Sequence, residues 1–122
     1  MNWTAIAIVA VILVAFLIFK RATLVSESAA REYLKQGAKV VDVRSPEEFR
    51  ERHLPGAINL PLGELTNRIL AVVPDKGQPV LLHCLSGGRS GMAQRKLRQM
   101  GYRNAFNLGG YSRAARIAGK SR

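Results

Sequence analysis

Two patterns of hydrophobic and polar positions divide the chain. Residues 3–19 are uncharged and almost wholly apolar, whereas the remainder alternates short apolar runs with polar, helix-like segments. The short apolar runs predict five strands, at 22–25, 39–43, 57–59, 80–82 and 105–108. Periodicity and start and stop signals predict helices at 26–36, from 45 onward, at 63–72, 90–100 and 111–118. Strands that alternate with helices indicate an α/β fold, a mainly parallel sheet with helices on both faces.

Serine residues mark two of these helix starts. Ser26 or Ser28 can cap the first helix of the α/β segment, and Gly37 is its stop signal. Ser45 precedes Pro46 and Glu48, which combines an N-cap, a proline in the first turn and a capping-box glutamate. The second helix start is therefore defined within four residues.

The apolar run at the N-terminus is interpreted as a membrane anchor. A secretory signal peptide would carry positive charge before the run and small residues at a cleavage site after it, but here Lys20 and Arg21 follow it. A buried core helix would not be this apolar throughout. As a helix, residues 3–19 would span roughly 25 Å, and snorkelling of Lys20 and Arg21 or local thinning could cover the deficit against a hydrocarbon core of about 30 Å.

The flanking charges predict the orientation of this single-pass anchor. Lys20 and Arg21 favour the cytoplasm for the C-terminal flank, so the N-terminus would lie outside and the following domain in the cytoplasm. The inverted orientation is the alternative. The predicted organisation is a transmembrane anchor at 1–21, one α/β domain at 22–119 and a basic tail at 120–122, with the last residues from Gly119 frayed.

Charge is concentrated after the apolar run. All 19 Lys and Arg and all 8 Asp and Glu lie there, which gives the domain the full net charge of +11, and Asp75 is the last acidic residue. A basic face suits anionic lipid headgroups, attraction of small anionic substrates, or simple solvation. Nucleic acid is not expected as a partner, because no aromatic interleaving or nucleic-acid motif accompanies the charge.

The chemistry of the chain is concentrated at residues 79–90. The single cysteine, Cys84, follows the apolar strand 80–82 and precedes Gly87 and Gly88, after which a helix begins near Ser90. A glycine-rich loop can turn several N–H groups inward as an anion nest, and the helix N-terminus and Arg89 add positive potential. These features favour the thiolate, which is the nucleophilic form. The alternative is an inert, buried cysteine.

The motifs of the chain, taken in order, resemble those of rhodanese-like sulfurtransferases. The active-site loop is Cys84–Ser90, the upstream motifs are residues 41–49 and 53–59, and the C-terminal motif is residues 108–110. The resemblance runs from about Thr23 to Gly119. It implies a rhodanese-like α/β domain with a mainly parallel sheet of about five short strands, preceded here by one transmembrane helix. No metal or organic cofactor is implied.

The resemblance also implies a reaction and a set of site residues. Cys84 would take sulfane sulfur from thiosulfate or a persulfide donor, carry it as a persulfide, and pass it to a thiol, a sulfur-accepting protein or cyanide. The substrate-binding residues would be those of the loop, Leu85, Ser86, Gly87, Gly88, Arg89 and Ser90. Arg89 is expected to support the anion. Asp42, Arg44 and His53 are supporting residues, and His53 is expected to pack or hydrogen-bond rather than transfer a proton.

With no second thiol in the chain, a persulfide on Cys84 cannot resolve into an internal disulfide. Sulfur must therefore pass to another molecule, and a reducing compartment suits a lone reactive cysteine. The chain departs from the family at Arg52, where glycine is frequent, at Leu85, where many members carry a basic residue, and at Ala114, where a tryptophan is expected. The change at Leu85 predicts weaker affinity for a doubly charged donor, and the change at Ala114 predicts a different position for the last helix.

Three alternative functions follow from the same residues. A Cdc25-like phosphatase also uses a His-Cys loop that ends in arginine, but its loop has one more residue than the four between Cys84 and Arg89, and phosphate needs the wider cradle. A non-catalytic module at the membrane would have no need of the cysteine, the glycines and the arginine together. A redox sensor that forms a sulfenic acid on Cys84 requires the same low thiol pKa, so only chemistry separates it from a sulfurtransferase.

Overall fold

The computed structural model describes residues 2–119 and shows a parallel sheet between two helical layers. The sheet has four strands in the order β2-β1-β3-β4, all parallel. Their bounds are Lys39–Asp42 for β1, Ile58–Asn59 for β2, Val80–His83 for β3 and Ala105–Gly109 for β4. The predicted α/β class and the parallel sheet are confirmed.

The predicted strand at 22–25 is reduced to a single bridge. Leu24 pairs in parallel with Asn107 of β4, and the Val25 N–H donates to the Asn107 carbonyl oxygen at 2.9 Å. The segment cannot extend further, because Ser26 already caps the next helix. The prediction of five strands is therefore wrong by one, and the edge of β4 is only locally covered.

Helices cover both faces of the sheet. They are α2 (Glu27–Lys35), α3 (Pro46–Glu51), α4 (Leu65–Val72), α5 (Gly88–Gln99) and α6 (Tyr111–Ala118), and a 3₁₀ turn at Leu62–Glu64 precedes α4. Both predicted serine caps are confirmed. Ser26 accepts a hydrogen bond from the Ala29 N–H at 3.2 Å, and Ser45 and Glu48 form a complete capping box.

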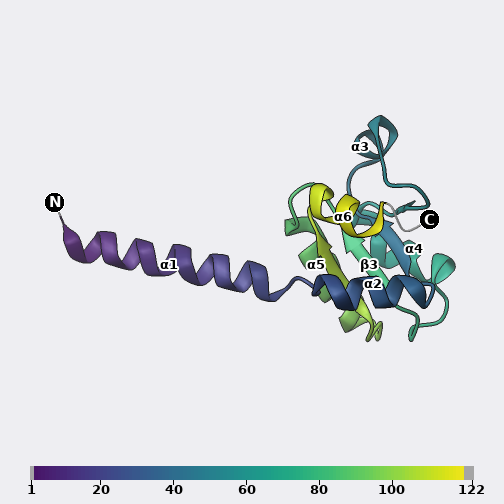
Figure 1. Ribbon diagram of the computed structural model, residues 1–122, viewed down its shortest axis with the longest axis horizontal. Helices are drawn as coiled ribbons and strands as arrows, with labels where there is room; N and C mark the ends of the chain where they lie inside the picture. Colours follow the sequence, from purple (N-terminus) through teal and green to yellow (C-terminus); the bar gives the residue numbers. More distant parts are fainter. Residues whose placement is uncertain (1, 120–122) are drawn as a thin grey trace.

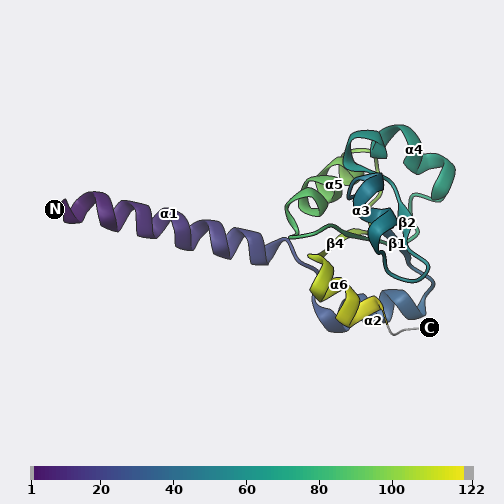
Figure 2. The ribbon, with the colours of Figure 1, turned by 90° about the horizontal axis from the view of Figure 1, so that it is seen from above.

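The two faces of the sheet build two separate apolar clusters. Val41 and Leu82 belong to the cluster beneath α4 and α5, whereas Val40 and Leu81 belong to the cluster beneath α2 and α6. Neighbouring residues of a strand point to opposite faces, so each short strand supplies both clusters. Figure 2 shows α2 and α6 on one side of the sheet and α4 and α5 on the other.

The N-terminal apolar run forms a long helix, α1 (Trp3–Ala22), which projects away from the sheet as a rod (Figure 1). Its large apolar side chains from Trp3 to Phe19 are exposed, between 46% and 74% of their surface. Within residues 2–119, no helix combines the length and the apolar character needed to cross a membrane. The helix is confirmed, but the predicted transmembrane span is not supported. The boundaries at 1–21 and 22–119 remain predictions, and the predicted tail at 120–122 lies outside the described residues.

Candidate active site

Cys84 lies at the carboxyl end of β3, where the chain turns into α5. The turn needs Gly87 at φ 98°, in the left-handed region that glycine adopts without strain. α5 then begins at Gly88, two residues earlier than the predicted start at Ser90, so Ser90 lies within its first turn. Parallel strands bring their carboxyl ends to one edge of the sheet, and this places the thiol where open α/β sheets bind ligands.

The Cys84 sulfur accepts hydrogen bonds from the loop that surrounds it. The Gly87 N–H donates to Sγ at 3.0 Å and the Ser90 N–H at 3.4 Å, and the Ser90 Oγ lies 3.4 Å from Sγ. Burial raises the pKa of the thiol, but the hydrogen bonds from Ser90 and Gly87 outweigh it, so the pKa lies below its ordinary value. The predicted inward-turned amides are therefore present, and they favour the thiolate.

The thiol is covered in this structure. Cys84 and Ser90 are fully buried, whereas Leu85, Ser86 and Gly88 are exposed on the outside of the loop. Leu85 exposes 54% of its surface. A molecule that reacts at Sγ therefore requires displacement of part of the loop.

Hydrogen bonds hold the loop against the end of β4. The Cys84 N–H donates to the Gly109 carbonyl oxygen at 3.1 Å, and Ser86 forms an antiparallel bridge with Gly110. The Asn107 side-chain amide donates to the Gly87 carbonyl oxygen at 3.3 Å. Residues 108–110 were predicted only as a motif of the family, and Asn107 was missed, because nothing in its sequence neighbourhood indicates a contact 20 residues away.

The side-chain hydrogen bonds of Arg89 go to a glutamate of α3. Its guanidinium forms a bidentate ion pair with Glu48 of α3, with Nη1–Oε1 and Nη2–Oε2 distances of 2.7 and 3.1 Å. The ion pair holds the pKa of Glu48 at about 2 and raises that of Arg89. A Coulombic interaction with Cys84 also contributes to the raised pKa of Arg89, so electrostatic support of the anion by Arg89 stays a prediction, while the hydrogen bonds to the sulfur come from the loop. Glu48, predicted only as part of a helix cap, is also a loop-positioning residue.

Asp42 and Arg44 form a buried ion pair behind the loop. Arg44 Nη2 lies 2.8 Å from Asp42 Oδ2, and Arg44 and Asp42 expose only 3% and 0% of their side chains. The Arg44 guanidinium also lies 4.8 Å from the centre of the Tyr111 ring, and the Tyr111 N–H donates to the Leu85 carbonyl oxygen at 3.1 Å. The pair therefore supports the loop through Tyr111, and the alternative of a surface ion pair is excluded.

His53 is not brought to the thiol. Its ring is exposed, stacks on Phe49 at 3.9 Å and shares a 2.8 Å hydrogen bond between Nδ1 and the Phe49 carbonyl oxygen. The expectation that His53 packs and hydrogen-bonds is confirmed. The last helix, α6, packs against the sheet although Ala114 stands where a tryptophan was expected. Ala114 is fully buried in the cluster beneath α2 and α6.

Among residues 2–119, no group of three His, Cys, Asp or Glu side chains is placed so that it could hold a metal ion.

His83, directly before Cys84, is buried with Nε2 3.7 Å from Asp42 Oδ2. Burial lowers the pKa of His83, which favours the neutral imidazole.

Comparison with known proteins agrees with this geometry. The sequence model of the rhodanese-like domain family matches residues 26–115. The chain is similar to thiosulfate sulfurtransferase PspE of Escherichia coli strain K12, with 46% identity over 70 residues that cover 57% of this chain and 67% of the relative.

Two solved structures share the fold and part of the sequence. A rhodanese with anions from E. coli is 42% identical, with a TM-score of 0.61, and the match covers 62% of this chain and 89% of that one. The human single-domain sulfurtransferase TSTD1 is 30% identical, with a TM-score of 0.65, and the match covers 77% of this chain and 96% of that one.

Proposed function

The chain belongs to the rhodanese-like domain family and is a sulfurtransferase-like enzyme, and on this basis we propose that Cys84 carries sulfane sulfur as a persulfide. The observation that carries the proposal is the set of hydrogen bonds from Gly87 and Ser90 to Sγ, which lowers the thiol pKa at the end of a parallel strand. Relatives whose names include sulfurtransferase support the same reaction class.

The proposed cycle has two displacements at one sulfur. The Cys84 thiolate attacks the outer sulfur of thiosulfate, the S–S bond of thiosulfate breaks, and sulfite leaves with the electron pair. The product is Cys–S–S⁻. A thiolate acceptor then attacks the terminal sulfur and leaves as a persulfide, or cyanide leaves as thiocyanate, and the Cys84 thiolate is restored. Each half-reaction conserves charge, and the cycle is of the ping-pong type.

The loop would bind the added sulfur through its backbone. Once Leu85 and Ser86 move aside, the inward N–H groups of Gly87 and Ser90 can donate to a terminal anionic sulfur as they now donate to Sγ. A persulfide donor, which carries less charge than thiosulfate, suits the exposed apolar Leu85 at the entrance. Arg89 has a positioning role through its ion pair with Glu48.

We also propose that α1 attaches the enzyme to a lipid bilayer, with the rhodanese-like domain on the cytoplasmic side. The proposal is supported by the exposed apolar side chains of residues 3–19 and by the basic residues that follow them in the sequence. In membrane fractions washed in buffer of physiological salt, the full chain should stay in the pellet, and a chain that begins at Thr23 should be released. Release of both would overturn attachment, and protection of a tag after Arg122 from protease added outside intact cells tests the cytoplasmic placement.

Sulfur transfer is tested by mass. Purified protein mixed with thiosulfate should gain the mass of one sulfur atom, the gain should be removed by cyanide, and Cys84→Ser should abolish it. Ser28→Ala, which removes an exposed hydroxyl from α2 outside the loop, is the matched control and should still gain sulfur. An unchanged mass together with release of phosphate from an aryl phosphate would replace the proposal with a phosphatase, and oxygen addition by peroxide without sulfur gain would favour a redox sensor.

A further inference from the structure

We infer that the groove between α1 and α5 binds the phosphate group of an anionic phospholipid, which holds the catalytic face against the bilayer. The groove has a cavity volume of about 570 Å³ and ends at the backbone of Ser86, Gly87 and Gly88 in the catalytic loop. The inference rests on the proposed attachment of α1 to a bilayer, and it does not depend on sulfur transfer.

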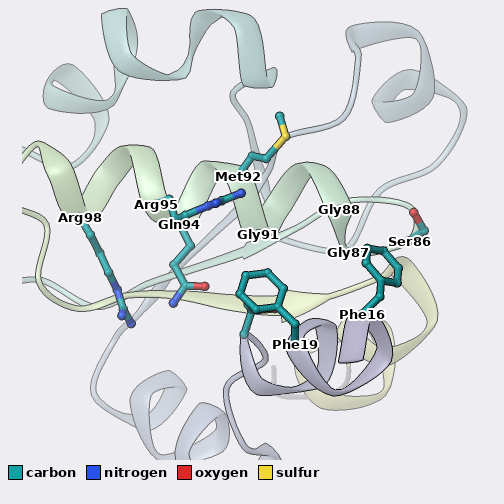
Figure 3. Close-up of a pocket in the computed structure, with 11 residues that line it drawn as sticks. Phe16, Phe19, Ser86, Gly87, Gly88, Gly91, Met92, Gln94, Arg95 and Arg98 are labelled. Atoms are coloured by element: carbon teal, nitrogen blue, oxygen red, sulfur yellow. The ribbon is translucent and has the colours of Figure 1, made fainter. Parts of the chain in front are cut away.

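The two walls of the groove differ in chemistry. Phe16 and Phe19 project from α1, whereas Met92, Arg95 and Arg98 come from α5 (Figure 3). One wall is therefore apolar and aromatic, and the other carries two guanidinium groups beside an exposed thioether. A molecule that fills the groove must present apolar chain to α1 and negative charge to α5, which describes an amphiphile with an anionic head.

The position of the groove at the catalytic edge is set by contacts just after α1. With its amide oriented to satisfy both groups, Gln94 of α5 donates to the Thr23 carbonyl oxygen at 3.2 Å and accepts from Arg98 at 2.9 Å. The Val25 N–H donates a hydrogen bond to the Asn107 carbonyl oxygen. The Asn107 side-chain amide in turn donates to the Gly87 carbonyl oxygen in the catalytic loop. α1 therefore leaves the domain at the same edge of the sheet as the loop.

Charge identifies the ligand as anionic. No acidic side chain lines the groove among the described residues, and the sequence has no acidic residue after Asp75. Arg98 is held in place, because its Nε donates to the Ala105 carbonyl oxygen at 3.0 Å and its guanidinium lies 5.4 Å from the centre of the Phe106 ring. Arg95 is exposed beside it and can turn toward a phosphate.

A bilayer lipid fits this site better than a soluble anion. A soluble anion would use the arginines and leave Phe16 and Phe19 uncovered, whereas a lipid brings its glycerol and upper acyl chains against both rings. The exposed apolar side chains of α1 continue directly from these two phenylalanines toward the N-terminus. A phospholipid beside α1 would therefore cover the apolar wall with its chains and place its phosphate at the level of Arg95 and Arg98.

The experiment measures partition of the full chain into vesicles of phosphatidylcholine with and without phosphatidylglycerol. Arg95→Gln removes one groove charge without removing any described contact, and Lys35→Gln is its matched control, because Lys35 is exposed at the end of α2 and does not line the groove. We expect Arg95→Gln to weaken partition into the anionic vesicles roughly five-fold and Lys35→Gln to change it little. Native mass spectrometry from phosphatidylglycerol nanodiscs should find one retained lipid on the wild type and on Lys35→Gln, and a several-fold smaller lipid-bound fraction on Arg95→Gln.

The outcomes separate the two ideas. Equal losses for Arg95→Gln and Lys35→Gln, or equal partition of the wild type into both kinds of vesicle, would overturn the lipid site and leave α1 attachment standing. Failure of the wild type to bind either vesicle would overturn attachment itself. Displacement of the retained lipid by inorganic phosphate would show that the groove binds a soluble anion instead. Sulfur gain at Cys84, measured on the same samples, reports the catalytic proposal independently.

Discussion

Removal of the Ser90 hydroxyl is the most direct perturbation of the thiolate. The Ser90 Oγ lies 3.4 Å from the Cys84 sulfur and 3.2 Å from the Gly87 carbonyl oxygen, and once the sulfur is a thiolate the single hydroxyl proton can be donated to it. Ser90→Ala leaves the N–H groups of Ser90 and Gly87 on the sulfur but deletes the side-chain hydrogen bond, which lowers the thiol pKa more than either amide does. The pKa of Cys84 should therefore rise toward its ordinary value.

The size of the effect follows from the strength of that hydrogen bond. A hydrogen bond to a charged group contributes roughly 1.5–3 kcal/mol, and the long O–S separation argues for the lower end. About 1.4 kcal/mol changes an ionisation equilibrium roughly ten-fold, so the thiolate fraction at pH values below the pKa should fall about ten-fold. At pH values well above the pKa, the variant and the wild type should carry the same charge.

The assay is the pH dependence of two rates, alkylation of Cys84 by iodoacetamide and sulfur gain from thiosulfate. The Ser90→Ala profile should lie at higher pH than the wild-type profile and reach the same alkylation rate at high pH, which shows that access to the sulfur is unchanged. Ser28→Ala, on the exposed surface of α2, is the control and should follow the wild type. Superimposed profiles for Ser90→Ala and the wild type would refute the assignment of the low thiol pKa to hydrogen bonding.

Three further predictions concern the support of the loop. Asp42→Asn should destabilise the fold by about 3–5 kcal/mol in urea unfolding, because it leaves a buried guanidinium without its charge partner; the exposed Glu47→Gln should cost less than about 1 kcal/mol, and equal costs would contradict this account. Gly110→Ala should slow sulfur gain and lower the melting temperature, since a Cβ there would lie 2.8 Å from a loop carbonyl oxygen, whereas Gly63→Ala meets no atom within 4 Å and should be neutral. The pKa of Glu48 is lowered from 4.5 to about 2, so the stability advantage of the wild type over Glu48→Gln should be complete above about pH 4.5 and disappear as the pH falls toward 2; a difference independent of pH would exclude the ion pair as its source.

Several elements could be predicted because their causes are local. The caps at Ser26 and Ser45 depend on residues within one helical turn, and both were correct. The strand before Cys84 depends on a short apolar run, and the loop after it on the conformational freedom of Gly87. Helix α5 was placed with an error of two residues, because Ser90 resembles a cap in sequence while its hydroxyl contacts the sulfur instead.

The support of the loop could not be predicted, because its partners are distant in sequence. Glu48 forms an ion pair with Arg89, which lies 41 residues away in the sequence. The sequence alone explained Glu48 as part of a helix cap and Arg89 as a cation of the loop, so neither residue indicated the other as its partner. The burial of Cys84 is likewise a property of the packed loop. It appears only when the ends of β3 and β4 lie side by side.

The amino-acid sequence determined that one thiol follows a buried strand, precedes a glycine turn and belongs to an α/β domain joined to an apolar helix. Periodicity, caps and turn residues act over a few positions, so these features can be predicted from the sequence. Only the tertiary structure decided that Arg89 pairs with Glu48, that hydrogen bonds from the end of β4 hold the loop, and that α1 leaves at the catalytic edge. Those contacts depend on which strand ends meet at one edge of the sheet, and parallel pairing of strands far apart in the chain sets that.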